Sequence, residues 1–207
     1  MLWLKTPKKK LSIPDWLSLY RILSVPVLLV FIFLDERLLF GTFLLISFLT
    51  DSLDGFLARR WNIVSQRGAQ LDSVGDAIAF TVGLVGVFHF ERTFFIDQIE
   101  LIIAAFSFYI VQLLAAYIRY GMPSSFHTYL AKLSALIQGV FMIWVFYFGV
   151  ELWLFYLVLA FSVLETIEEI ILIILFPKWK SDVKGLIWVM IERKRQNLPP
   201  TRMDASK

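Results

Sequence analysis

Residues 51–76 have the sequence DSLDGFLARRWNIVSQRGAQLDSVGD, with four aspartates between two long apolar runs. At 100° per residue, Asp51 and Asp54 share one face of a helix, and so do Asp72 and Asp76. Two such helices joined by a short loop can point four carboxylates toward one another. Ionisable groups in an apolar setting are costly, so their presence marks a functional site.

The composition is that of a membrane protein. Of the 207 residues, 58% are apolar and 16% are aromatic, and the mean hydropathy is +0.72. Soluble domains are usually about 45–50% apolar. The chain has no cysteine, which excludes disulfide and thiolate chemistry. We expect no cleavable signal peptide, because the first long apolar run begins near Trp16 and no small-residue cleavage site follows it.

Six apolar segments follow one another along the chain. Each is close to the ~20 residues that cross a hydrocarbon core, whereas barrel strands would be about half as long. The segments span 15–34, 38–60, 69–90, 98–120, 129–149 and 152–176. We therefore predict an all-α integral membrane protein with six transmembrane helices, in which residues 14–177 form one six-helix domain.

Lysine and arginine indicate the orientation. Of the 20 Lys and Arg residues, only Arg37 and Arg92 belong to the side opposite the termini. Because cytoplasmic loops carry such an excess, we predict a multi-pass protein of the inner (cytoplasmic) membrane with both termini in the cytoplasm. Residues 1–13 are predicted to be an interfacial segment, with a solvated tail as the alternative. Residues 178–207 are predicted to be a basic cytoplasmic tail, and beside a membrane we do not expect it to bind nucleic acid.

The two aspartate pairs are predicted to lie at matching depth. At about 1.5 Å per residue, counted from Arg60 and Gly68 as the cytoplasmic ends, both lie roughly 6–13 Å inside the membrane. Four carboxylates so close cannot all stay ionised without a cation. Oxygen ligands without His or Cys suit Mg²⁺, Mn²⁺ or Ca²⁺, and Mg²⁺ prefers to share its coordination with substrate phosphates. Two such ions can clamp a diphosphate, while one aspartate takes a proton from an attacking hydroxyl.

Small residues lie among these acids. Gly55, Ala58 and Gly68 leave room for a bulky group to approach the helix backbone. Small residues also serve helix–helix packing in membranes, so both interpretations stay open for them.

The full pattern resembles the signature of a known family. It is Asp51-x2-Asp54-Gly55-x2-Ala58-Arg59-x8-Gly68-x3-Asp72-x3-Asp76, and it is similar to that of the CDP-alcohol phosphotransferases (CDP-alcohol phosphatidyltransferases), resembling their phosphatidylglycerophosphate synthase-like members. The resemblance implies a homodimeric, metal-dependent enzyme of phospholipid biosynthesis. It would transfer a phosphatidyl group from CDP-diacylglycerol to the hydroxyl of a small alcohol, releasing CMP. Glycerol 3-phosphate is the acceptor we expect first, with serine, inositol phosphate, phosphatidylglycerol or another alcohol still open.

The resemblance also implies a role for each matching position. Asp51, Asp54 and Asp72 would hold two divalent ions, Mg²⁺ or Mn²⁺, and Asp76 would both bind metal and act as the general base. The residues implied in binding the CDP-lipid donor are Gly55, Ala58, Arg59, Ser65, Gly68 and Ser18.

The first apolar segment supports the match. Pro14-Asp15-Trp16-Leu17-Ser18-Leu19-Tyr20-Arg21 is similar to the Pro-Asn-x-Leu-Thr-x-x-Arg opening of this family. Ser18 keeps the hydroxyl of threonine as a donor. An ionised Asp15 cannot donate as asparagine does, and an N-cap of the first helix is the alternative role for it.

Other polar residues in the apolar segments are candidates for the acceptor site. Arg21, Arg119 and Lys132, with His127 nearby, could bind an anionic acceptor, and snorkelling to the interface is the alternative. Glu165, Glu168 and Glu169 share one helical face. They are expected to pair with these cations or to recognise acceptor hydroxyls.

Two other classes of protein use acids on apolar helices. An intramembrane prenyltransferase binds a diphosphate through aspartates and Mg²⁺, but its pattern would lack the Gly-x2-Ala-Arg insert. A divalent-cation transporter needs access from both sides, whereas these aspartates are all predicted in the inner half of the membrane.

Overall fold

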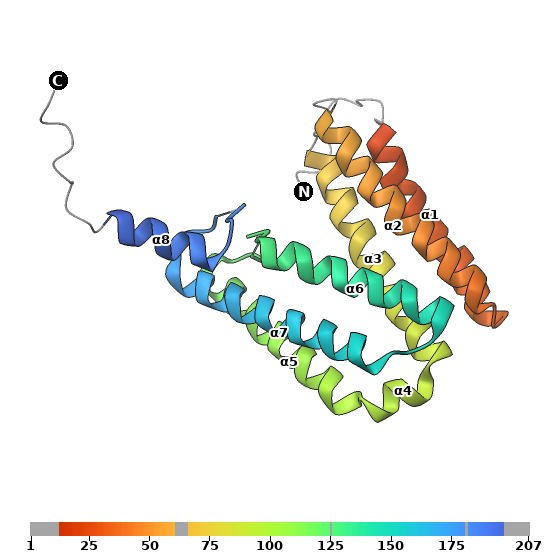
Figure 1. The fold of residues 1–207 in the computed structure, drawn as a ribbon. Coiled ribbons are helices and arrows are strands. Elements are labelled where there is room, and N and C mark those ends of the chain that lie inside the picture. Colours follow the sequence, from red (N-terminus) through yellow and green to blue (C-terminus); the bar gives the residue numbers. More distant parts are fainter. Residues whose placement is uncertain (1–12, 61–65, 125, 181, 197–207) are drawn as a thin grey trace, which may run out of the picture. The chain divides into compact units, whose positions relative to one another are not determined.

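The computed structural model describes residues 13–60, 66–124, 126–180 and 182–196, and every regular element in them is a helix (Figure 1). Side chains are described for residues 23–50, 75, 78–124, 126–180, 182–192 and 194. The helices are α1 (Ile13–Phe33), α2 (Arg37–Arg60), α3 (Gln66–Phe90), α4 (Arg92–Asp97), α5 (Ile99–Tyr120), α6 (Tyr129–Phe148), α7 (Leu152–Leu175) and α8 (Leu186–Gln196).

The all-α prediction is confirmed. The six predicted segments agree with α1, α2, α3, α5, α6 and α7 to within three residues at each end. The short helix α4 and the helix α8, which lies within the predicted basic tail, are additions to the predicted set.

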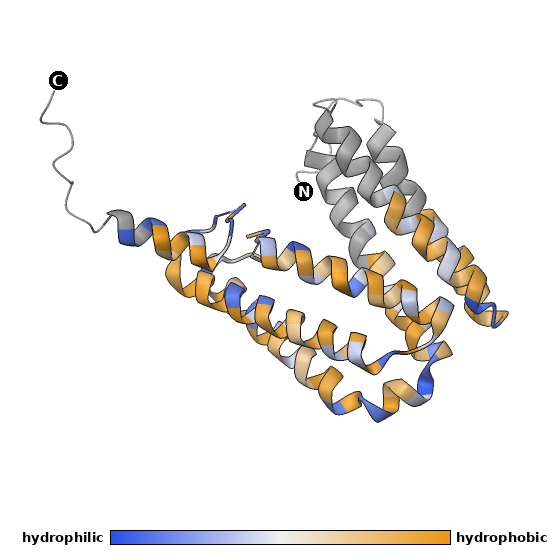
Figure 2. Ribbon diagram, viewed as in Figure 1, coloured by the Kyte–Doolittle hydropathy of each residue, from blue (hydrophilic) through white to orange (hydrophobic). Residues whose placement is uncertain are grey.

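Two helices of the described chain, α5 and α6, are long and apolar enough to cross a membrane. The side chains of α5 are mostly exposed, including Ile103 at 57% and Ile118 at 86%, so this apolar helix is not the core of a soluble fold. Figure 2 shows apolar residues over most of α5, α6 and α7, although α7 also carries three glutamates. The count of six crossings and the side on which the termini lie stay predictions.

The chain divides into two compact units, residues 1–96 with 142–150, and residues 97–141 with 151–207. In the first unit, α1, α2 and α3 pack against one another (Figure 1). Phe40 of α2 and Phe146 of α6 are fully buried at its centre, with ring centroids 4.8 Å apart and edge to face. This packing depends on Gly41, because a Cβ there would lie 2.6 Å from the Cβ of Phe146.

The start of α2 meets the end of α3 through Arg37. Its guanidinium forms a salt bridge of 2.5 Å with Glu91 and donates to the carbonyls of Phe146 and Val145, the last turn of α6. Helices α2 and α3 therefore run antiparallel, and this contact is a fixed point from which positions along both can be counted.

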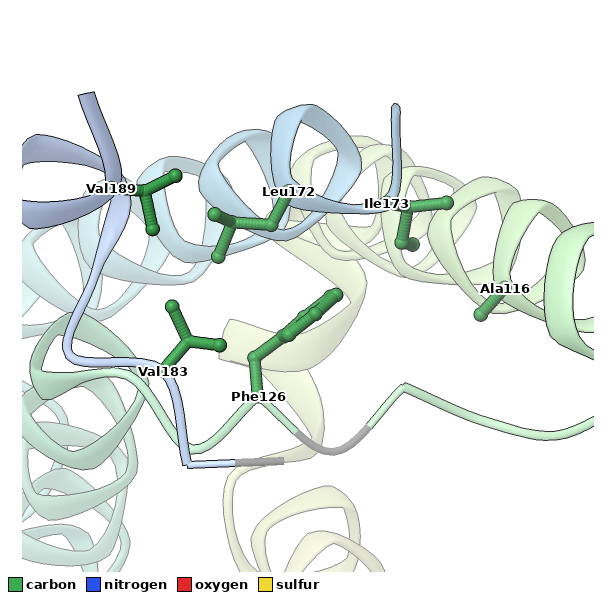
Figure 3. Packing of buried hydrophobic residues seen from close by; sticks show 6 residues of the cluster. All are labelled: Ala116, Phe126, Leu172, Ile173, Val183 and Val189. Atoms are coloured by element: carbon green, nitrogen blue, oxygen red, sulfur yellow. The ribbon is translucent and has the colours of Figure 1, made fainter. Parts of the chain in front are cut away.

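In the second unit, α5 packs against α7, and α7 packs against α8. A buried apolar cluster joins these helices to the segments before α6 and before α8, as Figure 3 shows. Its members are Ala116, Phe126, Leu172, Ile173, Val183 and Val189. The two connecting segments also touch through their backbones, where the Val183 N–H donates to the Phe126 carbonyl at 2.8 Å.

Candidate active site

The packed face of α2 leads directly to two of the aspartates. Phe40, Leu44 and Ser47 are buried there, at spacings of four and three residues. Asp51 and Asp54 lie seven residues beyond Leu44 and Ser47, so helical periodicity puts them on the same face. In the first half of α2 this face packs against neighbouring helices, and in the second half the same face carries the positions of Asp51 and Asp54.

The packed face of α3 leads to the other pair. Ala79 is 4% exposed, and Asp72 lies seven residues before it. Asp76 lies seven residues before Gly83, and a Cβ on Gly83 would be 3.3 Å from Leu44 Cδ2 of α2. A Cβ on Gly83 would also overlap the Met142 sulfur of α6, so Gly83 lies where α3 meets both α2 and α6, and helical periodicity puts position 76 on that same side of α3.

The contact between Leu44 and Gly83 fixes the register of the two antiparallel helices. Moving seven residues along each from this contact, a rise of about 10 Å, leads to Asp51 on α2 and Asp76 on α3 at the same height. Counting from the Arg37–Glu91 salt bridge gives the same result. The rise along α2 from Arg37 to Asp51 is about 21 Å, and the rise along α3 from Glu91 back to Asp76 is about 22 Å. The backbone register is compatible with the matching depth predicted from the sequence, and the depth itself stays a prediction.

The side chains of all four aspartates lie outside the described set. Among the described residues, no three His, Asp or Glu side chains gather as a metal site. The predicted divalent-ion site thus depends on Asp51, Asp54, Asp72 and Asp76. One described neighbour fits it, because the Ser47 hydroxyl, one turn before Asp51, is buried and has no hydrogen-bond partner among the described residues. The predicted donor set, four carboxylates, consists of the oxygen ligands that Mg²⁺ and Mn²⁺ take, and the Ser47 hydroxyl is an oxygen of the same kind.

The predicted donor-binding residues and the acceptor candidate Arg21 are placed by their helices only. The backbone has Ser18 and Arg21 on α1, Gly55, Ala58 and Arg59 on the last turns of α2, and Gly68 on the first turn of α3. Their side chains, and Ser65 as a whole, lie outside the described residues.

A polar cavity of about 140 Å³ lies in the second unit at the start of α6. Lys132, an acceptor candidate from the sequence, is in its wall together with His127, Tyr129, Asp182, Val183 and Lys184. Lys184 was missed by the sequence reasoning, because it comes from a segment far along the chain that packs beside α6. Two lysines and one aspartate around a cavity of this size can hold a small phosphorylated alcohol.

Arg119, the other described acceptor candidate, has a structural contact. Its Nε donates to the Phe176 carbonyl at 3.3 Å, at the end of α7, and the residue does not line the cavity at Lys132. A cation at a helix C-terminus is favoured by the helix dipole.

The glutamates of α7 accept hydrogen bonds from neutral groups. Glu169 accepts from the Gln112 amide and the Ser124 hydroxyl at 2.5 and 2.8 Å. Glu168 accepts from the Thr128 hydroxyl at 2.7 Å and from the Leu186 N–H at 2.8 Å. Within the described chain, neither Arg119 nor Lys132 forms a salt bridge with these glutamates, so the expected ion pairs with these two cations are not formed. The neutral partners were not identified from the sequence, because the tertiary fold brings them to α7 from α5, from the loop before α6 and from the start of α8.

Comparison with known proteins agrees with the pattern in residues 51–76. The family model described as CDP-alcohol phosphatidyltransferase matches residues 11–164, more than half of the chain. This range includes α1, α2 and α3, which carry all four aspartates.

Curated relatives match shorter stretches. A protein of Sodalis glossinidius is 35% identical over 79 residues, 37% of this chain and 43% of its own length. One of Haemophilus influenzae is 36% identical over 90 residues, 42% of this chain and 49% of its own. One of Wigglesworthia glossinidia brevipalpis is 33% identical over 96 residues, 45% of this chain and 53% of its own.

All three relatives are named CDP-diacylglycerol–glycerol-3-phosphate 3-phosphatidyltransferase. The chain spans about half the length of the curated relatives that it matches. The signature on α2 and α3, their register, and the family match over residues 11–164 together show that this chain belongs to the CDP-alcohol phosphatidyltransferase family.

Proposed function

We propose that the protein transfers the phosphatidyl group of CDP-diacylglycerol to a hydroxyl of glycerol 3-phosphate and releases CMP, as a step of phospholipid synthesis. The observation that supports the proposal is the antiparallel register of α2 and α3, because counting along both backbones from the described contacts brings the aspartate positions of the two helices to similar heights. The family supports the transferase chemistry, and the names of the relatives support the two substrates.

In this proposal, Asp51, Asp54, Asp72 and Asp76 hold two divalent ions, Mg²⁺ or Mn²⁺. When bound, such ions neutralise charge on the diphosphate of the donor. Asp76 accepts the proton of the acceptor hydroxyl. The oxygen then forms a bond to the phosphatidyl phosphorus while the bond from that phosphorus to the CMP oxygen breaks, and CMP leaves with the electron pair.

The donor is proposed to lie along the ends of α2 and α3. Gly55, Ala58 and Gly68 have small or absent side chains, so that the nucleotide can approach the backbone closely. Arg59 supplies a cation for the phosphates of the donor, because guanidinium groups bind phosphate oxygens in pairs. Ser18 and Ser65 are proposed to offer hydroxyls to the nucleotide.

The acceptor phosphate is proposed to bind Lys132. Lys132 lines a cavity with Lys184, and the two ammonium groups can neutralise a phosphomonoester. Arg21 and Arg119 stay sequence-based candidates for binding the acceptor, and Arg119 lies outside the wall of the pocket at Lys132. With Asp182 in the same wall the lysines leave a net positive charge, so an acceptor with a net negative charge, such as glycerol 3-phosphate, is favoured over serine, whose net charge is zero.

We further propose that the protein is a homodimer in the inner (cytoplasmic) membrane, with six crossings and its active site toward the cytoplasm. The bias of Lys and Arg toward one side of the predicted spans supports this orientation.

The test uses purified protein with CDP-diacylglycerol, Mg²⁺ or Mn²⁺, and separate acceptors. Release of CMP and the lipid product are measured with glycerol 3-phosphate, serine, inositol phosphate and phosphatidylglycerol. CMP release that depends on glycerol 3-phosphate supports the proposal, whereas turnover with another acceptor only would correct the substrate. Turnover of labelled prenyl diphosphate, without CMP release from any CDP-lipid, would contradict the proposed chemistry.

A further inference from the structure

Helix α8 has an apolar surface that the rest of the second unit does not cover. One side of it packs inward through Val189, which is 8% exposed. The other sides carry four large apolar residues that are about half exposed or more, namely Ile187 at 66%, Trp188 at 48%, Met190 at 59% and Ile191 at 49%. An 11-residue helix that exposes so much apolar area needs a partner, since exposed apolar patches mark interaction sites.

The orientation of α8 on its unit is fixed by a part-buried contact. Glu168 of α7 accepts the Leu186 N–H, the first of the helix, at 2.8 Å. Gly185, just before it, has φ of 145°, and a Cβ there would lie 3.1 Å from Glu168 Oε1. Val189 joins the apolar cluster of Figure 3. Because α8 is held at these points, its outer apolar side chains stay turned away from the unit.

Aromatic and basic residues border this apolar surface. The ring of Trp188 lies 5.4 Å from that of Tyr129, and both are about half exposed. Trp179, 44% exposed, donates its indole N–H to the Pro123 carbonyl at 3.2 Å. The exposed lysines in and beside α8 are Lys178, Lys180, Lys184 and Lys194. Half-exposed tryptophan and tyrosine beside lysine are typical of side chains at the level of lipid headgroups.

We propose that α8 lies in the headgroup region of a lipid bilayer containing anionic lipids, and that this contact is independent of the transfer reaction. Ile187, Met190 and Ile191 enter the acyl boundary, and Lys178, Lys180 and Lys194, which lie outside the pocket at Lys132, bind headgroup phosphates. Charge distinguishes this partner from a second copy of the chain. In a twofold contact the same surface meets itself, and its four exposed lysines outnumber the two exposed acids beside them, Asp182 and Glu192, so like charge would be left facing like charge.

The chain has no cysteine, which makes single labelling sites available. The variants Ile187→Cys and Ile191→Cys are labelled with bimane in the full-length protein. Each is reconstituted into phosphatidylcholine vesicles with and without phosphatidylglycerol. Quenching by aqueous iodide and by lipid-attached nitroxide is then measured. Glu36→Cys, in the exposed turn between α1 and α2, is the aqueous reference, and Ile110→Cys, exposed on apolar α5, is the lipid reference.

The proposal predicts that, with phosphatidylglycerol, both α8 labels are quenched several-fold less by iodide than the Glu36→Cys label and are quenched by the lipid nitroxide. Their protection from iodide should fall when phosphatidylglycerol is omitted. Iodide quenching at the level of the Glu36→Cys label would overturn the proposal, as would protection that is the same in both lipids. If the α8 labels lose their protection from iodide in nanodiscs that hold a single copy of the protein, the apolar surface of α8 contacts a second copy instead of lipid.

Discussion

At the scale of single residues, Ser47 lies on α2 between the buried apolar residues of the first half of the helix and the aspartates of the second half. Its hydroxyl is buried, 1% exposed, and has no hydrogen-bond partner among the described residues. A buried hydroxyl without a partner costs about 1–3 kcal/mol, so a protein that keeps one usually uses it. The position of Ser47 one turn before Asp51 points to the acidic site as that use.

Replacement of Ser47 should therefore separate stability from activity. Ser47→Ala removes the unpaired hydroxyl, so we expect the unfolding temperature in detergent to rise by about 2–4 °C for each kcal/mol gained. CMP release should fall at the same time, because the polar neighbour of Asp51 is lost. Thermal unfolding and CMP assays on the same preparation check this. A lower unfolding temperature with unchanged activity would show that the hydroxyl has a structural partner.

At the scale of helices, close packing in the first unit depends on glycine at defined contacts. Gly41 of α2 lies against the Cβ of Phe146, an atom that cannot move without its helix. Gly139 of α6 has no atom within 4 Å of the position where a Cβ would be. The two glycines form a matched pair, since both lie inside helices and differ in what surrounds them.

Gly41→Ala should destabilise the protein by roughly 1–3 kcal/mol, because the added methyl overpacks the contact between α2 and α6. Gly139→Ala should stabilise it by up to about 1 kcal/mol through helix propensity. Thermal or denaturant unfolding of both variants measures the difference. Equal effects of the two substitutions would contradict the close contact at Phe146.

The carboxylate of Glu168 connects two segments that are distant in sequence. It accepts from Thr128, just before α6, and from the first N–H of α8. Glu169, next to it, contacts Gln112 and Ser124 instead. Glu168→Ala should therefore loosen α8 and speed tryptic cleavage at Lys184 several-fold, whereas Glu169→Ala should leave that cleavage unchanged. Equal cleavage in both variants would show that the Glu168 contact does not hold α8.

At the scale of the whole molecule, the positions of the long helices were predictable from the sequence, whereas contacts between residues far apart in the sequence were not. Six segments were correct because 3.6-residue periodicity and apolar length are local properties. The acidic face also follows from local seven-residue spacings, and it stays a prediction because the aspartate side chains lie outside the described set. Lys184 beside Lys132, and Ser124 and Thr128 on the glutamates, were missed because the tertiary fold brings these residues together.

Chelation tests the proposed ions for the whole enzyme. EDTA should stop CMP release, and Mg²⁺ or Mn²⁺ should restore it, because four carboxylates at one height need a cation to remain ionised. Asp72→Asn should require a higher Mg²⁺ concentration for half-maximal rate. A full rate in excess chelator would contradict the metal site while leaving the family assignment intact.

The most direct test of the central claim compares the parent protein with the Asp76→Asn variant, using CDP-diacylglycerol, glycerol 3-phosphate and Mg²⁺. Asp76 is at the height of Asp51 in the register fixed by Leu44 and Gly83. Asparagine keeps the shape of the side chain but cannot accept the proton of the acceptor hydroxyl. We predict that the parent releases CMP and that the variant, with the same elution profile and unfolding temperature, releases none above background. CMP release by Asp76→Asn at the parent rate would contradict the claim.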